Sequence, residues 1–140
     1  ANILEPSSEQ CDRLFITQPI FTLEDIFTLQ HVKYRNFRTK TIQIVFDVKD
    51  YVENEDFISK VLDSICKEAE DAVNSDFTYI ILSDRMAGRN YIPISPLLAV
   101  GAVHHHLIEK RLRMKCALIV ETGEAREVHH ICLLLGYGAD

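Results

Sequence analysis

The sequence of 140 residues has no tryptophan, only two methionines, and no long uninterrupted apolar run. None of its apolar stretches approaches the roughly 18 residues that a membrane-spanning helix needs, so we expect no membrane partner. The formal net charge is −6, and no basic stripe with interleaved aromatic residues is present. Nucleic acid is therefore not an expected partner either.

The sequence also lacks a C-x-x-C pair. Its four cysteines, at positions 11, 66, 116 and 132, are widely dispersed, and the last three lie within apolar segments. This pattern is typical of reduced, buried thiols in an intracellular protein. It favours neither a disulfide framework nor a zinc or iron–sulfur site.

Strands and helices are expected to alternate along most of the chain. Runs of β-branched and apolar residues predict strands over 41–48, 77–82 and 116–120. Apolar residues at three- and four-residue steps predict helices, one from Asn54 to about 73, one starting at Pro96 and one ending at Gly136. Before the first strand, Thr22 and Asp25 have the spacing of a capping box for a short helix that ends near His31.

This order predicts an α/β fold of consecutive parallel βα units, either doubly wound or an incomplete (β/α) barrel-like domain. We expect residues 1–140 to be part of a single domain. Residues 138–140 look like the approach to a fourth strand. The sequence is therefore expected to be truncated after the third βα unit. The isolated piece is expected to be marginally stable or to self-associate, because an edge and an apolar helix face lose their cover.

Five of the six histidines form two clusters, His104-His105-His106 and His129-His130. Adjacent helical positions point about 100° apart, so a metal site would need one histidine from each cluster plus a carboxylate such as Glu127. One hypothesis is thus an independent α/β domain that binds a metal or small ligand through these clusters. The alternative is that the histidines form hydrogen bonds that tie the helices to their neighbours.

Polar residues follow two of the predicted strands: Ser83, Asp84 and Arg85 after one, and Glu121 and Thr122 after the other. In α/β folds the carboxyl ends of parallel strands usually carry the groups that contact ligands. A purely structural interpretation is equally available. In it, Asp84 pairs with Arg85 or Arg89, and Thr122 or Gly123 caps the following helix.

Four motifs carry a resemblance to one family. They are IILSDR at 80–85, PLLAVGAVHHHL at 96–107, VETGEAREVHH at 120–130 and LGYGAD at 135–140. In order and spacing they resemble the central domain of the glutamate synthase large subunit. Looser similarity upstream extends the resemblance over nearly the whole chain, with residues 48–75 and 86–94 the least specific.

The resemblance implies a parent oxidoreductase that makes glutamate from glutamine and 2-oxoglutarate in the cytoplasm or a plastid. Such a parent carries FMN and an iron–sulfur cluster and takes electrons from NAD(P)H or ferredoxin. Its central domain links the glutamine amidotransferase domain to the FMN domain, binds no flavin, and contributes to the ammonia tunnel.

The family's catalytic cysteine, flavin-binding segments and cysteine cluster have no counterpart in this sequence. We therefore expect a non-catalytic fragment with no catalytic, cofactor-binding or metal-binding residue of its own. Its partners are expected to be neighbouring domains of the parent enzyme. The candidates for tunnel or inter-domain contacts are Ser83, Asp84, Arg85, Glu121, Thr122, His105 and His129.

Overall fold

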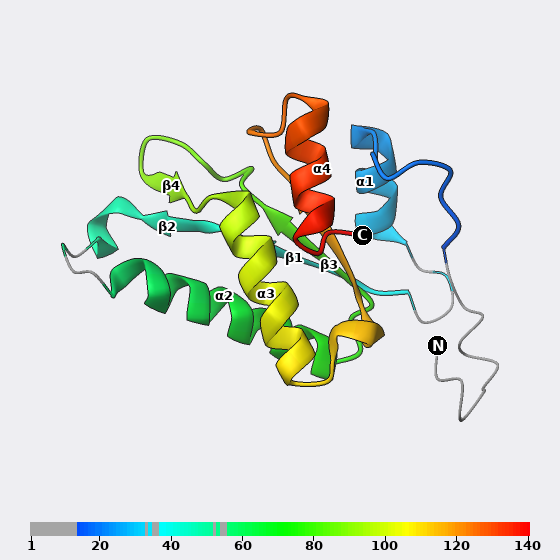
Figure 1. Cartoon of the computed structure of the whole chain (residues 1–140), viewed down its shortest axis with the longest axis horizontal. Coiled ribbons are helices and arrows are strands. Elements are labelled where there is room, and N and C mark those ends of the chain that lie inside the picture. Colours follow the sequence, from blue (N-terminus) through cyan, green and yellow to red (C-terminus); the bar gives the residue numbers. More distant parts are fainter. Residues whose placement is uncertain (1–13, 33, 35–36, 52, 54–55) are drawn as a thin grey trace.

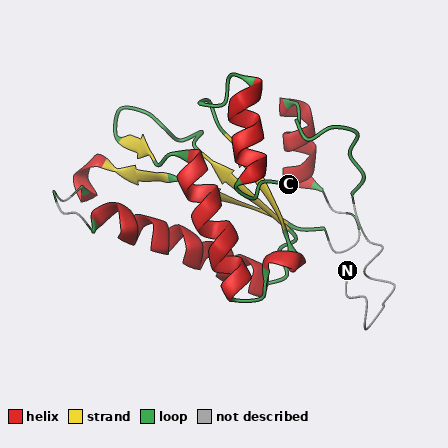
Figure 2. Ribbon diagram, in the orientation of Figure 1, coloured by secondary structure: helices red, strands yellow, loops and turns green. Residues whose placement is uncertain are grey.

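The computed structural model describes residues 14–32, 34, 37–51, 53 and 56–140. Its centre is a parallel sheet in the order β1-β3-β5, formed by Thr39–Gln43, Tyr79–Ser83 and Ala117–Glu121. In this described part of the chain four α-helices accompany the sheet, namely α1 (Leu23–His31), α2 (Phe57–Asn74), α3 (Pro96–Glu109) and α4 (Val128–Gly136) (Figures 1 and 2). The predicted α/β class and the parallel strands are confirmed, and the sheet is not closed into a barrel.

The central strand β3 is buried along its whole length. On one face of the sheet Ile80, Leu82 and Leu118 pack with α2, α3 and Leu134 of α4. On the other face Tyr79, Ile81 and Ile119 pack against α1. A strand covered on both faces has no solvent-facing side, which explains why its sequence does not alternate between apolar and polar residues.

The single strand predicted over 41–48 is wrong in one respect, because Ile44 divides it. The Ile44 amide donates to Ser83 of β3 at 2.9 Å, and its carbonyl accepts from Ile94 at 2.8 Å. After Ile44 the chain leaves the main sheet as β2 (Val45–Asp47). This strand pairs antiparallel with β4 (Tyr91–Pro93), which is not among the three predicted strands.

The predicted start of α1 is confirmed, because Thr22 and Asp25 form both hydrogen bonds of a capping box. Asn54, the expected start of α2, lies outside the described residues, and the helix is described from Phe57. Two short 3-10 turns complete the described elements, η2 (Val48–Asp50) and η3 (Arg113–Lys115). Within the described part of the chain, no helix is both long and apolar enough to cross a membrane.

The cysteine prediction is correct for two of the three cysteines that are described. Cys66 and Cys116 are buried, and burial raises the pKa of both thiols to about 11, so they are thiols rather than thiolates at neutral pH. Cys132 is exposed, contrary to expectation, because α4 turns this part of its apolar sequence away from the core. Cys11 lies outside the described residues.

Candidate functional site

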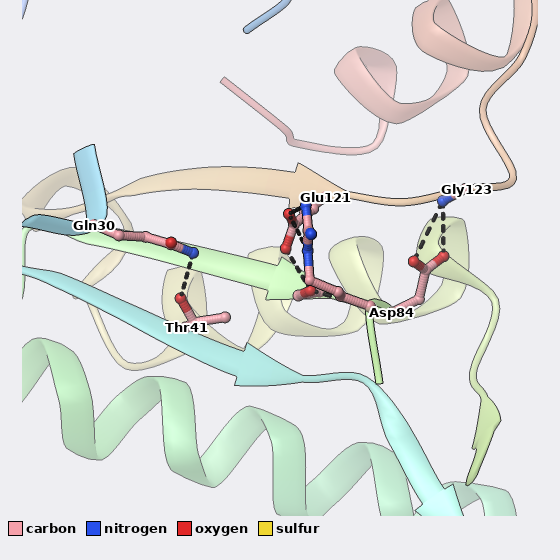
Figure 3. Close-up of polar contacts among 7 residues, drawn as sticks. Gln30, Thr41, Asp84, Glu121 and Gly123 are labelled. Atoms are coloured by element: carbon pink, nitrogen blue, oxygen red, sulfur yellow. Dashed lines mark hydrogen bonds and ion pairs between the residues drawn. The ribbon is translucent and has the colours of Figure 1, made fainter. Parts of the chain in front are cut away.

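The parallel pairing of β3 with β5 aligns Ser83 with Glu121 at the carboxyl end of the sheet. The buried Ser83 hydroxyl donates to Glu121 Oε2 at 2.6 Å, and the backbone amide of Arg85 donates to the same hydroxyl at 3.2 Å. The Arg85 guanidinium reaches the other carboxylate oxygen, with Nε at 2.9 Å and Nη2 at 2.7 Å from Oε1 (Figure 3). Three predicted residues therefore form one connected cluster.

Asp84 organises the loop after β5. Its carboxylate accepts from the Thr122 hydroxyl at 2.5 Å. It also accepts from the Gly123 amide at 3.1 Å (Figure 3). The Thr122 oxygen in turn accepts from the Glu124 amide at 3.0 Å. The structural interpretation was thus wrong in its details, because Arg85 pairs with Glu121 rather than Asp84. Thr122 and Gly123 fold the loop, and the N-cap position of α4 is Glu127.

The neighbours of Glu121 favour the ionised form of its carboxyl group. Burial by itself raises the pKa of this carboxyl, but the hydrogen bonds from Arg85 and Ser83 and the charge of Arg85 outweigh burial and lower the pKa below its usual value. A lowered folded-state pKa means that this cluster stabilises the fold above the unfolded-state pKa of about 4.3. That contribution is lost as the pH falls through the folded-state pKa.

These strand ends do not fit the phosphate of a flavin. A phosphate at this edge would need free backbone amides at the start of a helix. The Gly123 amide is instead bound to the Asp84 carboxylate, a fixed negative charge that would repel a phosphate. An iron–sulfur cluster is held by several cysteines. Cys66 lies on α2 and Cys116 next to β5, and the described residues contain no group of three histidine, cysteine or acidic side chains placed to hold a metal ion.

The histidine clusters form separate contacts. His106 Nε2 lies 2.8 Å from Glu70 Oε2 and so ties α3 to α2, while His130 Nδ1 accepts from the Arg126 amide at 3.3 Å. His105 and His129 are exposed, on α3 and α4 respectively. Among residues 14–140 with the gaps noted above, no group of three histidine, cysteine or acidic side chains is placed to hold a metal ion. The geometry thus favours the hydrogen-bonded interpretation of the histidines.

A second polar cluster, which sequence analysis missed, surrounds Arg113. Its guanidinium donates to His104 Nδ1 at 3.0 Å, to the Cys116 and Gly138 carbonyls at 2.9 Å each, and to Asp140 Oδ2 at 2.8 Å. Arg113 belongs to a basic run, 110–115, and such runs are typical of the last turn of a helix. Its four partners lie between His104, 9 residues before Arg113, and Asp140, 27 residues after it. No local sequence pattern indicates contacts over such a span.

An apolar groove of about 240 Å³ lies between α1 and α4, over the outer edge of β5. Phe21 and Ile26 line it from the α1 side, Ile131 and Leu134 from the α4 side, and Val120 between them. Figure 1 shows the two helices side by side. Large apolar side chains are also exposed on or next to them, including Leu23, Phe27, Val128, Leu135 and Tyr137. We call this set, together with the groove, the α1–α4 surface.

Comparison with known proteins gives one consistent family. The family described as the glutamate synthase central domain matches residues 1–140. The chain is 41% identical to the NADH glutamate synthase of Schizosaccharomyces pombe and 37% identical to the NADPH glutamate synthase large chain of Bacillus subtilis. It is 33% identical to the ferredoxin-dependent glutamate synthase of Antithamnion sp.. Each match covers 99% of this chain but only 6% to 9% of the relative.

Proposed function

The chain belongs to the glutamate synthase central domain family, and on this basis we propose that it is one part of the central domain of a glutamate synthase. The longer protein makes glutamate from glutamine and 2-oxoglutarate, using FMN, an iron–sulfur cluster and electrons from NAD(P)H or ferredoxin. This central domain links the glutamine amidotransferase domain to the FMN domain. The relatives include NADH-dependent, NADPH-dependent and ferredoxin-dependent glutamate synthases, which supports this choice of reaction and donors.

The part played by this chain is to position loops, without chemistry of its own. The observation that carries this role is the internal use of the polar groups at the strand ends. Glu121 is bound by Ser83 and Arg85, and Asp84 by Thr122 and Gly123. A carboxylate held by neighbouring donors is poorly suited to act as a base, but it fixes the two loops that follow β3 and β5. In the proposal these loops form part of the tunnel wall or of a domain contact.

Two further features support a role in contacts between domains. His105 and His129 are exposed on α3 and α4 and are available to neighbouring domains of the longer protein. The α1–α4 surface exposes several large apolar side chains close together, as surfaces that meet another protein or domain do. For the same reason we expect the isolated chain to self-associate.

The proposal is tested by separating the two half-reactions in the full-length enzyme. Glu121→Gln removes the charge that holds Arg85, so the loops should loosen and ammonia should escape. We expect the ratio of glutamine hydrolysed to glutamate formed to rise, with free ammonia appearing in solution. Glu68→Gln is the matched control, because Glu68 is exposed on α2 and pairs only with Lys40 among the described residues. Loss of both half-reactions in equal proportion, with no released ammonia, would refute the coupling role.

A further inference from the structure

The outer edge of β5 has its own pattern of hydrogen bonds. In a parallel strand, the amide and carbonyl of alternate residues face the same neighbour. Ala117 and Glu121 face β3, since the Ala117 amide donates to Thr78 and the Glu121 carbonyl accepts from Asp84. Leu118 and Val120 therefore face outward, away from β3.

The first outward-facing groups already have partners. The Cys116 carbonyl accepts from Arg113 at 2.9 Å, and the Leu118 carbonyl accepts from the Asp140 amide at 2.9 Å. The Leu118 amide donates to Asp140 Oδ2, also at 2.9 Å. In a regular parallel ladder the Leu118 amide would donate to a backbone carbonyl of the neighbouring strand rather than to a side chain. The Gly138 carbonyl, two residues earlier, is instead bound to Arg113. Asp140 thus begins a ladder along this edge and completes its first rung with its side chain.

Val120 is the next outward-facing residue. Among the described residues no hydrogen bond is made to its backbone on the outer side, where it lines the α1–α4 groove. An unpaired amide and carbonyl in an apolar groove are costly to leave without partners. The groove is therefore suited to an extended segment that supplies both a donor and an acceptor.

From this geometry we infer that the outer edge of β5 binds one further strand, parallel to β5 and formed by Asp140 and the residues that follow it in the longer protein. The inference rests on the proposed function, because it requires the longer protein. The bond from the Asp140 amide to the Leu118 carbonyl fixes the register of this strand. Within the sheet, the Ala117 amide donates to the Thr78 carbonyl, and Ala117 pairs with Tyr79, the residue after Thr78. In the same way Asp140 pairs with Ile119, the residue after Leu118, and the Val120 amide donates to the Asp140 carbonyl.

The groove also specifies the side chains of this strand. One face of the strand meets Phe21 and Ile26, and the other meets Ile131 and Leu134. Because both walls are apolar, the strand must be apolar on both faces, as β3 is. A second copy of this chain does not fit as well. Two identical edges related by a twofold axis would pair antiparallel, and Asp140 and Arg113 already occupy the first half of this edge.

The test is amide hydrogen exchange in the full-length protein, resolved to single residues within β5. We expect the Val120 amide to exchange about as slowly as the Ile119 amide, which faces β3. Exchange of Val120 about tenfold or more faster than Ile119 would overturn the inference. A variant in which Asp140 and the first few residues after it are replaced by a Gly/Ser sequence of equal length should lose protection at Leu118 and Val120, whose amides face outward.

Protection of Ile119 in that variant serves as the internal control, because it reports that β3 and β5 still pair. If Val120 stays protected in the variant, another segment fills the groove and the named strand is wrong. Glutamate formation is assayed on the same unmodified protein. Absence of that activity would refute the proposed function, whereas the exchange result speaks only to the strand.

Discussion

Helices α3 and α4 are both rich in apolar residues but differ in how much of their surface is covered. In α3 five residues are buried, and Val100, Val103 and Leu107 are fully enclosed. In α4, whose sequence is the more apolar of the two, only Leu134 is buried. The difference follows from position. Helix α3 packs against α2, α4 and the sheet, whereas α4 contacts α3 and lies across the groove from α1 at the outer edge of β5 (Figure 1).

The comparison shows that the apolar composition of a helix does not by itself predict how much of the helix is buried. Exposed apolar surface is costly unless something covers it. We therefore expect the exposed apolar side chains of α4 to be covered by other parts of the longer protein. The strand proposed for the β5 edge would cover its inner side, and a neighbouring domain would cover its outer side.

The largest expected effect contrasts one leucine from each helix. Leu107→Ala removes a fully buried side chain and should lower the free energy of unfolding of this chain by about 4 kcal/mol. Leu133→Ala makes the same change on α4, where the side chain is 36% exposed, and should cost about 1 kcal/mol or less. Urea denaturation measures both values. Equal losses would show that α4 is as well packed as α3.

A smaller effect is expected where the two helices meet. Gly138 has a φ of +114°, and a Cβ atom there would lie 2.2 Å from His104 Nδ1. Gly138→Ala should therefore break the bond from Arg113 to His104 and destabilise the chain by about 3 kcal/mol.

Gly136→Ala is the matched control, because nothing lies within 4 Å of its added Cβ. It should change stability by no more than about 1 kcal/mol, since alanine favours a helix more than glycine does. The comparison is again made by urea denaturation. A Gly138→Ala variant as stable as the control would mean that the end of α4 is not fixed by this contact.

Much of the fold could be predicted because its signals are local. Thr22 and Asp25 mark a helix start by their spacing, and the apolar run of β3 marks a buried strand. The break at Ile44 could not be predicted in this way. Its amide and carbonyl bind Ser83 and Ile94, about 40 and 50 residues away, and nothing in the run 41–48 indicates the change of partner.

The candidate site shows the same limit. The carboxyl ends of β3 and β5 were identified from strand order, but the pairing of Arg85 with Glu121 depends on the register between the strands. Arg113 went unnoticed because its role comes from Gly138 and Asp140, which reach it only after α4 has folded back. The contact roles proposed for His105 and His129 stay predictions.

The account is tested most directly by the reactivity of Cys132 in the full-length protein. This thiol is exposed on α4 in the present structure, whereas Cys66 and Cys116 are buried and serve as unreactive references. Alkylation is followed by mass spectrometry of the peptide that contains each cysteine, with the denatured protein defining full reactivity. If another part of the longer protein covers the exposed side of α4, Cys132 will react about as slowly as the two buried cysteines. Reaction of Cys132 in the native full-length protein as fast as in the denatured protein would contradict the account.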